Sequence, residues 1–169
     1  MTPFYGKFRG VVTDNQDPLQ IGRIRARVPD VTGDDDTGWA MPCFPAAGQG
    51  MGIISLPKVG AGVWIEFEHG NPDYPIWTGA WFGNLSELPP ELLIPPMMQD
   101  GKILLKTSGG TSLILDDTPG TGGIILETAT GQKLKLSATG IEIDNGQGAK
   151  ITMGPGPMIN INNGALEII

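Results

Sequence analysis

The fold of this chain is decided by its last stretch, residues 101–169: GKILLKTSGGTSLILDDTPGTGGIILETATGQKLKLSATGIEIDNGQGAKITMGPGPMININNGALEII. Short aliphatic segments alternate there with glycine-containing turns, and each segment holds two apolar residues spaced two apart. Residues two apart lie on the same face of a β-strand. Each segment therefore predicts a short strand with one narrow apolar face, which cannot form a core alone and needs copies of the same pattern to pack against.

The eight predicted strands are identified by their apolar pairs, whose first members stand seven to eleven residues apart, the length of one strand and one turn. The pairs are Ile103/Leu105, Leu113/Leu115, Ile124/Leu126, Leu134/Leu136, Ile141/Ile143, Ile151/Met153, Ile159/Ile161 and Leu166/Ile168. Glycines at 109–110, 122–123, 131, 140, 146, 148, 154, 156 and 164 supply the backbone freedom that the turns need.

Two architectures can use such strands. A single-chain β-solenoid takes about three strands per coil, so eight strands would form fewer than three coils, too few for a continuous core. A prism of three chains takes one strand from each chain per layer and directs every apolar pair toward a common axis. With about 4.8 Å between layers, the shaft would be about 40 Å long. The pattern favours the prism, with the fourteen residues of the first seven pairs as the trimer core.

The distribution of aromatic residues supports a narrow axis and divides the chain. All eleven aromatic residues, from Phe4 to Phe82, lie before residue 83, and the tail has none. Two Pro-Pro pairs follow, in residues 84–100, and favour extended backbone. We expect three parts: a barrel at 1–83, a proline-rich linker at 84–100 and an intertwined shaft at 101–169. We expect Leu88, Leu92, Leu93 and Ile94 to pack on the barrel or on a neighbouring chain.

The first part predicts a small closed β-barrel. Residues 6–13, 19–28, 62–68 and 74–82 alternate apolar with polar or aromatic residues, as strands do. In the second strand we expect four residues on the buried face and a bulge at Gly22; the four are Ile21, Ile24, Ala26 and Val28. In the third, Val63, Ile65 and Phe67 should line the barrel.

Net charge and composition exclude several classes of function. The chain carries a formal charge of −7, and a protein that holds nucleic acid through phosphates normally shows a basic stripe instead. No stretch of about 18 apolar residues predicts a membrane-spanning helix. The first residues, MTPFYGKFRG, lack the apolar core of a signal peptide, so export by that route is not expected.

Candidate catalytic or metal-binding residues are few. Glu66 and Glu68, two apart on one strand, are best read as a solvated face, and the acidic loop 34–36 lacks the glutamate that a calcium loop needs. His69 is the only histidine and forms neither a triad nor a metal cluster. Cys43 is the only cysteine and is expected to be a small buried core residue. We therefore expect no enzyme activity, cofactor or metal.

Two motifs carry a resemblance to a known family. They are D-P-x-x-x-G-R-x-R-x-R-x-P at residues 17–29 and P-x-x-G-x-x-V-x-I-E-F-E-x-G-x-P-D-x-P-x-W-x-G at residues 57–79. This half of the chain resembles the OB-fold (oligonucleotide/oligosaccharide-binding) barrel at the base of phage central spikes, type VI secretion spikes and related contractile injection machines. The aliphatic tail is similar to the trimeric triple-stranded β-helix of those spikes. The resemblance implies an all-β fold, an OB-fold barrel followed by a trimeric β-prism.

The resemblance also implies a function. A structural homotrimer would form the central spike of a baseplate, joined to a tail hub protein and touching the target envelope only transiently as it pierces it. Such a particle, a virion baseplate or an injection machine, would assemble in the bacterial cytoplasm. Some phage spikes close their tip with an iron-binding His-x-His pair, which NNGALEII lacks. A separate PAAR-repeat tip protein is expected instead, on Leu166, Ile168 and Ile169.

One alternative function remains open. OB-fold barrels also bind single-stranded nucleic acid or oligosaccharides by stacking on aromatic side chains. The four tryptophans of the first part could serve in this way, although the acidic charge disfavours nucleic acid; they are Trp39, Trp64, Trp77 and Trp81.

Overall fold

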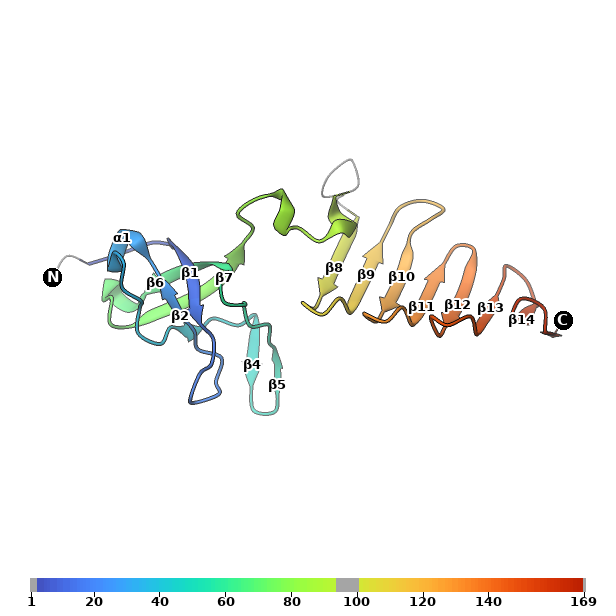
Figure 1. The fold of residues 1–169 in the computed structure, drawn as a ribbon, viewed down its shortest axis with the longest axis horizontal. Helices are drawn as coiled ribbons and strands as arrows, with labels where there is room; N and C mark the ends of the chain where they lie inside the picture. Colours follow the sequence, from blue (N-terminus) through green and yellow to red (C-terminus); the bar gives the residue numbers. More distant parts are fainter. Residues whose placement is uncertain (1–2, 94–100, 169) are drawn as a thin grey trace. The chain divides into compact units, whose positions relative to one another are not determined.

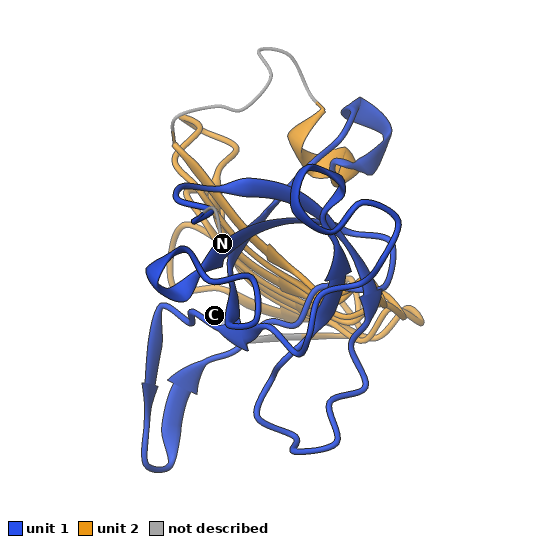
Figure 2. Cartoon of the chain, turned by 90° about the vertical axis from the view of Figure 1, so that its left-hand side faces the viewer, with its two compact units in different colours: residues 1–88 blue, residues 89–169 orange. Residues whose placement is uncertain are grey.

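The structure is a computed structural model that describes residues 3–93 and 101–168. The chain divides into two compact units, Met1–Leu88 and Pro89–Ile169 (Figures 1 and 2). Strands dominate both units, and the few helices are of three or four residues. None of the helices within the described ranges is long and apolar enough to cross a membrane.

Unit 1 contains a five-stranded sheet with the order β2-β1-β6-β7-β3. Its strands are β1 (Phe8–Asp14), β2 (Arg25–Arg27), β3 (Met41–Pro42), β6 (Gly62–Phe67) and β7 (Pro75–Trp81). All neighbours pair antiparallel except β3 and β7. Beside the two edge strands, Ile24 and Ala40 exchange backbone hydrogen bonds of 3.2 and 2.7 Å. These bonds close the sheet into a barrel, which is seen end-on in Figure 2.

The barrel core lies inside this closed sheet. Val63, Ile65 and Phe67 of β6 are buried, as their alternation predicts, while the intervening Trp64 and Glu66 are half-buried. Among the described residues, the buried apolar set is Val12, Ile24, Ala26, Val28, Ala40, Val63, Ile65, Phe67 and Trp77. Phe4 and Phe8 pack beside it at one end, since the Phe8 and Phe67 ring centroids lie 5.6 Å apart and those of Phe4 and Phe8 lie 6.0 Å apart.

Two sequence predictions about residues 19–28 are wrong. Ile21, expected on the buried face, is 47% exposed, because residues 17–22 form a loop and β2 begins only at Arg25. The register irregularity lies on the partner strand, between Val12 and Asp14, rather than at Gly22.

Cys43 is the second correction to the expected core. The residue is exposed, because β3 is only two residues long and stands at the edge of the sheet. Phe44 packs against the core in its place, with its ring edge-on to Trp77 at a centroid distance of 5.5 Å.

The remaining elements of unit 1 were not anticipated from sequence. They are α1 (Pro29–Thr32), the hairpin of β4 (Ala46–Gly48) and β5 (Met51–Ile53), and the 3-10 turns η1 (Glu68–Gly70) and η2 (Leu85–Glu87). The hairpin forms a two-stranded sheet of its own, separate from the barrel sheet.

Unit 2 is an antiparallel meander in which every strand pairs with its neighbours in sequence. After η3 (Pro90–Leu92), its strands are β8 (Lys102–Lys106), β9 (Ser112–Asp116), β10 (Gly123–Glu127), β11 (Lys133–Ser137), β12 (Gly140–Asp144), β13 (Lys150–Met153), β14 (Ile159–Ile161) and β15 (Leu166–Ile168). The eight strands coincide with the eight segments that the apolar pairs predicted. Figure 1 shows them as successive rungs along the unit.

Three turns on one edge of the meander share a hydrogen-bonding scheme that fixes the register. In each, the side-chain oxygen of the first residue accepts a hydrogen bond from the backbone N–H of the fifth, as Ser, Thr and Asn side chains do in turns. The backbone N–H of Thr111 donates to Thr107 Oγ1 (3.1 Å), that of Gln132 to Thr128 Oγ1 (3.2 Å) and that of Ala149 to Asn145 Oδ1 (2.9 Å). Thr and Asn at these positions therefore set the length of the turn between rungs.

The opposite edge depends on two glycines at strand starts. Gly123 (φ +146°) and Gly140 (φ +130°) lie in the region that favours glycine, and a Cβ there would stand 1.9 Å from the Leu136 carbonyl oxygen and 2.0 Å from that of Met153. Any side chain would break the backbone pairing between adjacent rungs.

We predict that Gly140→Ala destabilises unit 2 by more than about 1 kcal/mol, because the positive φ and the backbone clash both oppose a Cβ. Thermal unfolding followed by far-ultraviolet circular dichroism measures the change. Gly154→Ala is the matched control, since a Cβ at Gly154 would meet nothing within 4 Å. Equal melting temperatures for the two variants would contradict the prediction.

Candidate functional site

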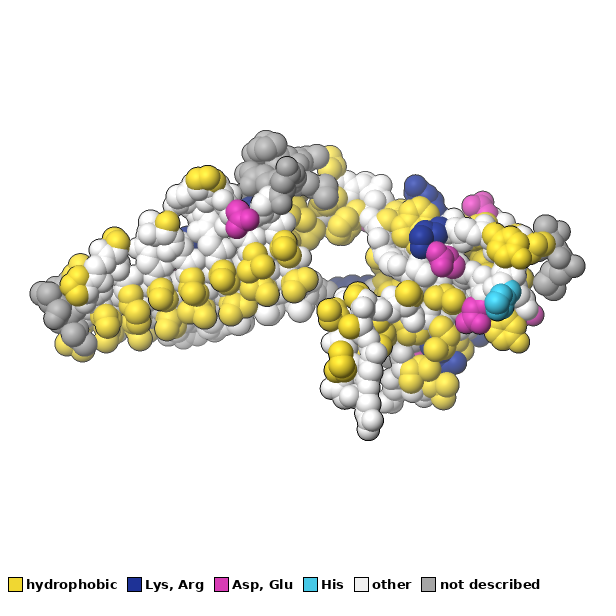
Figure 3. Space-filling view, turned by 180° about the vertical axis from the view of Figure 1, so that it is seen from behind, with side chains coloured by type: hydrophobic (Ala, Val, Ile, Leu, Met, Phe, Trp, Pro, Cys, Tyr) yellow, Lys and Arg dark blue, Asp and Glu magenta, His cyan; other side chains and the backbone are white. Residues whose placement is uncertain are grey.

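The candidate site of unit 2 is one face of its sheet, on which the apolar pairs line up in two continuous rows. The strand register places each pair directly opposite the next. Row 1 contains Ile103, Leu115, Ile124, Leu136, Ile141, Met153, Ile159 and Ile168. Row 2 contains Leu105, Leu113, Leu126, Leu134, Ile143, Ile151, Ile161 and Leu166. Figure 3 shows apolar side chains running along this unit as an unbroken stripe.

Within one chain these rows are poorly covered. Leu105 is 63% exposed, Ile103 59% and Leu166 53%, and most members of the rows from Leu115 to Met153 are also partly open to solvent. Burying a side chain of this size contributes about 1.5–3 kcal/mol. A contiguous apolar surface of this length is the usual mark of an interface.

A groove of about 690 Å³ follows row 2. Leu126, Leu134, Ile143, Ile151 and Ile161 form its apolar floor. The turns that begin at Thr128 and Asn145 line its rim, together with other polar residues of the same edge. The groove is therefore apolar at its base and polar along one rim, and its open side could receive a protruding apolar segment.

The opposite face of the sheet changes character along its length. Its central row begins with Leu104, Ile114 and Ile125 and continues with Lys135 and Glu142. Ion pairs join neighbouring strands there, at 3.8 Å between Lys133 Nζ and Glu127 Oε2, 2.7 Å between Lys150 Nζ and Glu142 Oε2, and 3.1 Å between Lys102 Nζ and Asp116 Oδ2. Beyond its apolar start this face is suited to water, so the two aliphatic rows are the larger surface that must be covered.

The short segment before β8 is held to the end of that strand by one ion pair. Lys106 Nζ donates a hydrogen bond to Glu91 Oε1 of η3, and this bond lowers the pKa of Glu91. Leu92 is half-buried. Of the four apolar linker residues expected to pack, Leu88 and Leu92 are half-buried, Leu93 is more exposed, and Ile94 lies outside the described residues.

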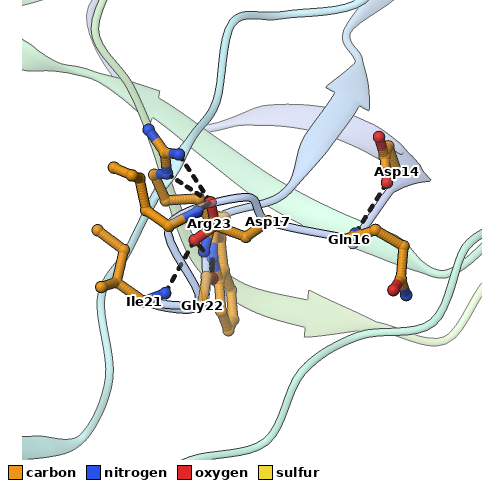
Figure 4. A network of polar contacts seen from close by, with 8 residues as sticks. Asp14, Gln16, Asp17, Ile21, Gly22 and Arg23 are labelled. Carbon is orange, nitrogen blue, oxygen red and sulfur yellow. Dashed lines mark hydrogen bonds and ion pairs between the residues drawn. The ribbon is translucent and has the colours of Figure 1, made fainter.

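The barrel surface is organised around the carboxylate of Asp17. Arg23 donates to Asp17 Oδ1 from Nε (2.9 Å) and from Nη2 (2.7 Å), and the backbone N–H groups of Leu19, Ile21 and Arg23 also donate to this carboxylate (Figure 4). The Arg23 hydrogen bonds, with the backbone donors, hold the pKa of Asp17 well below its ordinary value. The D-P-x-x-x-G-R motif is thus a loop closed on one side chain.

The tryptophans of the barrel do not form an open stacking platform. Trp77 is buried, and its Nε1 donates to the Gly22 carbonyl at 3.0 Å. Arg9 lies over Trp64 and Trp81, at 5.4 and 4.9 Å from the ring centroids. Trp39 is approached by the guanidinium groups of Arg23 and Arg25, each at 5.4 Å.

The other candidate side chains are separated from one another. Lys7 Nζ bonds to Glu66, whereas Glu68 lies beyond the end of β6, in η1 beside the exposed His69. Asp36 faces Arg27 at 3.8 Å, after α1. Among the described residues, no three His, Cys, Asp or Glu side chains are arranged to hold a metal ion.

Two known domains match this architecture. The type VI secretion system/phage-baseplate injector OB domain matches residues 8–82, and the phage baseplate V C-terminal trimerisation domain matches residues 102–167. A search of curated proteins gives no match. The two domains define a structural component of a phage baseplate or type VI secretion injector. The chain belongs to the baseplate V family of spike-like proteins, and the predicted OB-fold and trimerisation architecture is confirmed.

We predict that the Asp17 loop makes barrel stability depend on pH. A carboxyl whose pKa is depressed on folding stabilises the fold above its unfolded pKa of about 3.9, and the contribution is lost as the pH falls toward the folded value. The melting temperature should therefore drop as the pH is lowered from about 5 to 3, and less steeply in Asp17→Asn. All four tryptophans lie in unit 1, so their fluorescence reports on the barrel alone.

Asp34→Asn is the control for this prediction, because Asp34 is exposed. Its profile should run parallel to that of the unaltered protein. A profile for Asp17→Asn as steep as the unaltered one would show that the loop carboxylate does not control acid stability.

Proposed function

We propose that this protein is the homotrimeric central spike of a contractile tail or injection machine. The barrel joins the spike to a tail hub protein, and the shaft passes through the target envelope when the machine contracts, in transient contact with that envelope. The spike assembles in the bacterial cytoplasm and acts as part of the virion baseplate or injector particle. Its work is mechanical and requires no reacting residue.

The observation that carries this proposal is the pair of aliphatic rows. Three sheets that face a common axis would bury the fourteen residues from Ile103 to Ile161 and leave the charged faces in water. Each row 2 groove would then receive the adjoining edge of the next copy, since a closed threefold ring joins unlike edges. A core of this kind is thin and aliphatic, in keeping with the absence of aromatic residues from 101–169.

Rigidity follows from how the strands connect. Consecutive rungs are joined by backbone hydrogen bonds along the whole meander, and an aliphatic core continuous across three chains would resist bending of each sheet. The alternative, an OB-type binding module for oligosaccharide or single-stranded nucleic acid, finds less support. The tryptophans it requires are buried or covered by arginine side chains.

We predict a particle of about 54 kDa in light scattering, three chains of 17.9 kDa. Ile143→Lys should dissociate it, because three ammonium groups would be buried near the axis without partners, at several kcal/mol each. Thr152→Lys is the control, since Thr152 lies opposite Glu142 on the charged face and should leave the mass unchanged. A monomeric unaltered protein would refute the trimer.

A tip protein of the PAAR-repeat kind is the second partner that we propose. Its contact would be β15, where Leu166 is 53% exposed and the outer edge of the strand is unpaired within the described part of the chain. Ile168 belongs to the same strand, and Ile169 lies outside the described residues.

We predict that a PAAR-repeat protein is retained by the full chain in a pull-down and lost when the chain is truncated before Ala165. Removal of β15 exposes β14 instead, so the truncated trimer should first be checked by light scattering. Equal retention by both forms would show that the tip contact is not on β15.

A further inference from the structure

The β4–β5 hairpin presents an apolar surface that its own barrel does not cover. Met51 is 65% exposed, Ile53 62% and Ile54 68%. Residues 43–57, CFPAAGQGMGIISLP, contain no charged side chain, although the chain as a whole carries a charge of −7. An isolated two-stranded hairpin is at best marginally stable in water. A surface with these properties is suited to packing against another apolar surface.

The length of the connection to unit 2 decides which surface is within reach. Only residues 82–89 separate the end of β7 from η3, which the Glu91–Lys106 ion pair fastens to β8. Eight residues span at most about 30 Å, and a barrel of this size has a radius of gyration of about 12 Å. In a trimer, three barrels would be held together at millimolar effective concentration. A second copy is therefore the nearest available partner.

A matching apolar surface exists on the same barrel. The Asp17 loop displays Leu19 (63% exposed) and Ile21 on a backbone that the Asp17 carboxylate fixes. The side chain of Asn15 donates to the Pro57 carbonyl at 3.0 Å and ties this loop to the segment after the hairpin. Figures 1 and 2 show the hairpin and the loop extending from the same side of the barrel. A closed ring of three needs two unlike contact surfaces on each copy, one for each neighbour.

We infer that the β4–β5 hairpin of one copy packs on the Asp17 loop of the next copy, which joins the three barrels into a closed ring. Met51 and Ile53 supply the apolar contact, and Leu19 and Ile21 receive it. The pre-ordered loop lowers the entropy lost on contact, since its backbone is already held. This inference rests on the trimeric state proposed above and adds a second interface to it.

The test is photo-crosslinking of the full-length protein. A benzoylphenylalanine at position 53 should yield, on denaturing gels, crosslinked species of two and three chains, with the crosslink mapped by mass spectrometry to residues 15–23. The same group at Tyr74, an exposed aromatic residue elsewhere on the barrel, is the control and should give at least tenfold less interchain product. Benzoylphenylalanine at position 51 provides a second crosslinking site on the same hairpin.

Light scattering of each labelled protein separates the two proposals. If the protein is a trimer but the crosslinks at positions 51 and 53 stay within one chain, the proposed ring of barrels is wrong and the proposed trimeric spike still stands. A product enlarged by anything other than whole 17.9 kDa chains would also overturn it and assign the hairpin to a different protein. A monomeric protein would contradict both the proposed trimer and the proposed ring of barrels.

Discussion

A strand face that one chain cannot bury is the constraint on which the rest of this structure depends. Each rung of unit 2 carries two aliphatic side chains on one side, while the other side changes from aliphatic at the first three strands to charged beyond them. In the proposed trimer, burial of the aliphatic rows between copies would supply the stabilisation that a single-layer sheet lacks. The turns then serve this face: their Thr, Asn and Gly residues keep every pair in register with the next.

The barrel obtains its order in another way. Its core is small, and one loop is held by five hydrogen bonds to a single carboxylate, two from Arg23 and three from backbone N–H groups. Arg23 also approaches Trp39, and Trp77 of β7 donates to Gly22, so the end of the loop is held against the barrel. A short motif of Asp, Gly and Arg thus holds a surface loop in place without burying more apolar area.

The sequence determines much of this fold because its signals are local. In unit 2 the spacing of two within pairs and the glycines between them are sufficient to locate all eight strands, since each strand pairs only with its sequence neighbours. Fewer features of the barrel can be predicted from the sequence. Ile21 follows the apolar alternation, yet Asp17 draws its backbone into a loop. Cys43 follows a two-residue edge strand, and the strands of the β4–β5 hairpin are only three residues long, too short to show an alternating pattern. The structure at these positions depends on contacts between residues that are far apart in the sequence.

The meander of unit 2 has a consequence for how such shafts vary. Every connection joins adjacent rungs, and both aliphatic rows pass through each rung at the same two positions. Two further strands with the same spacing would extend the sheet by about 10 Å and leave its cross-section unchanged. Length is therefore a modular property of the sequence, counted in whole hairpins, and reach can be altered by duplication or deletion without redesign of the fold.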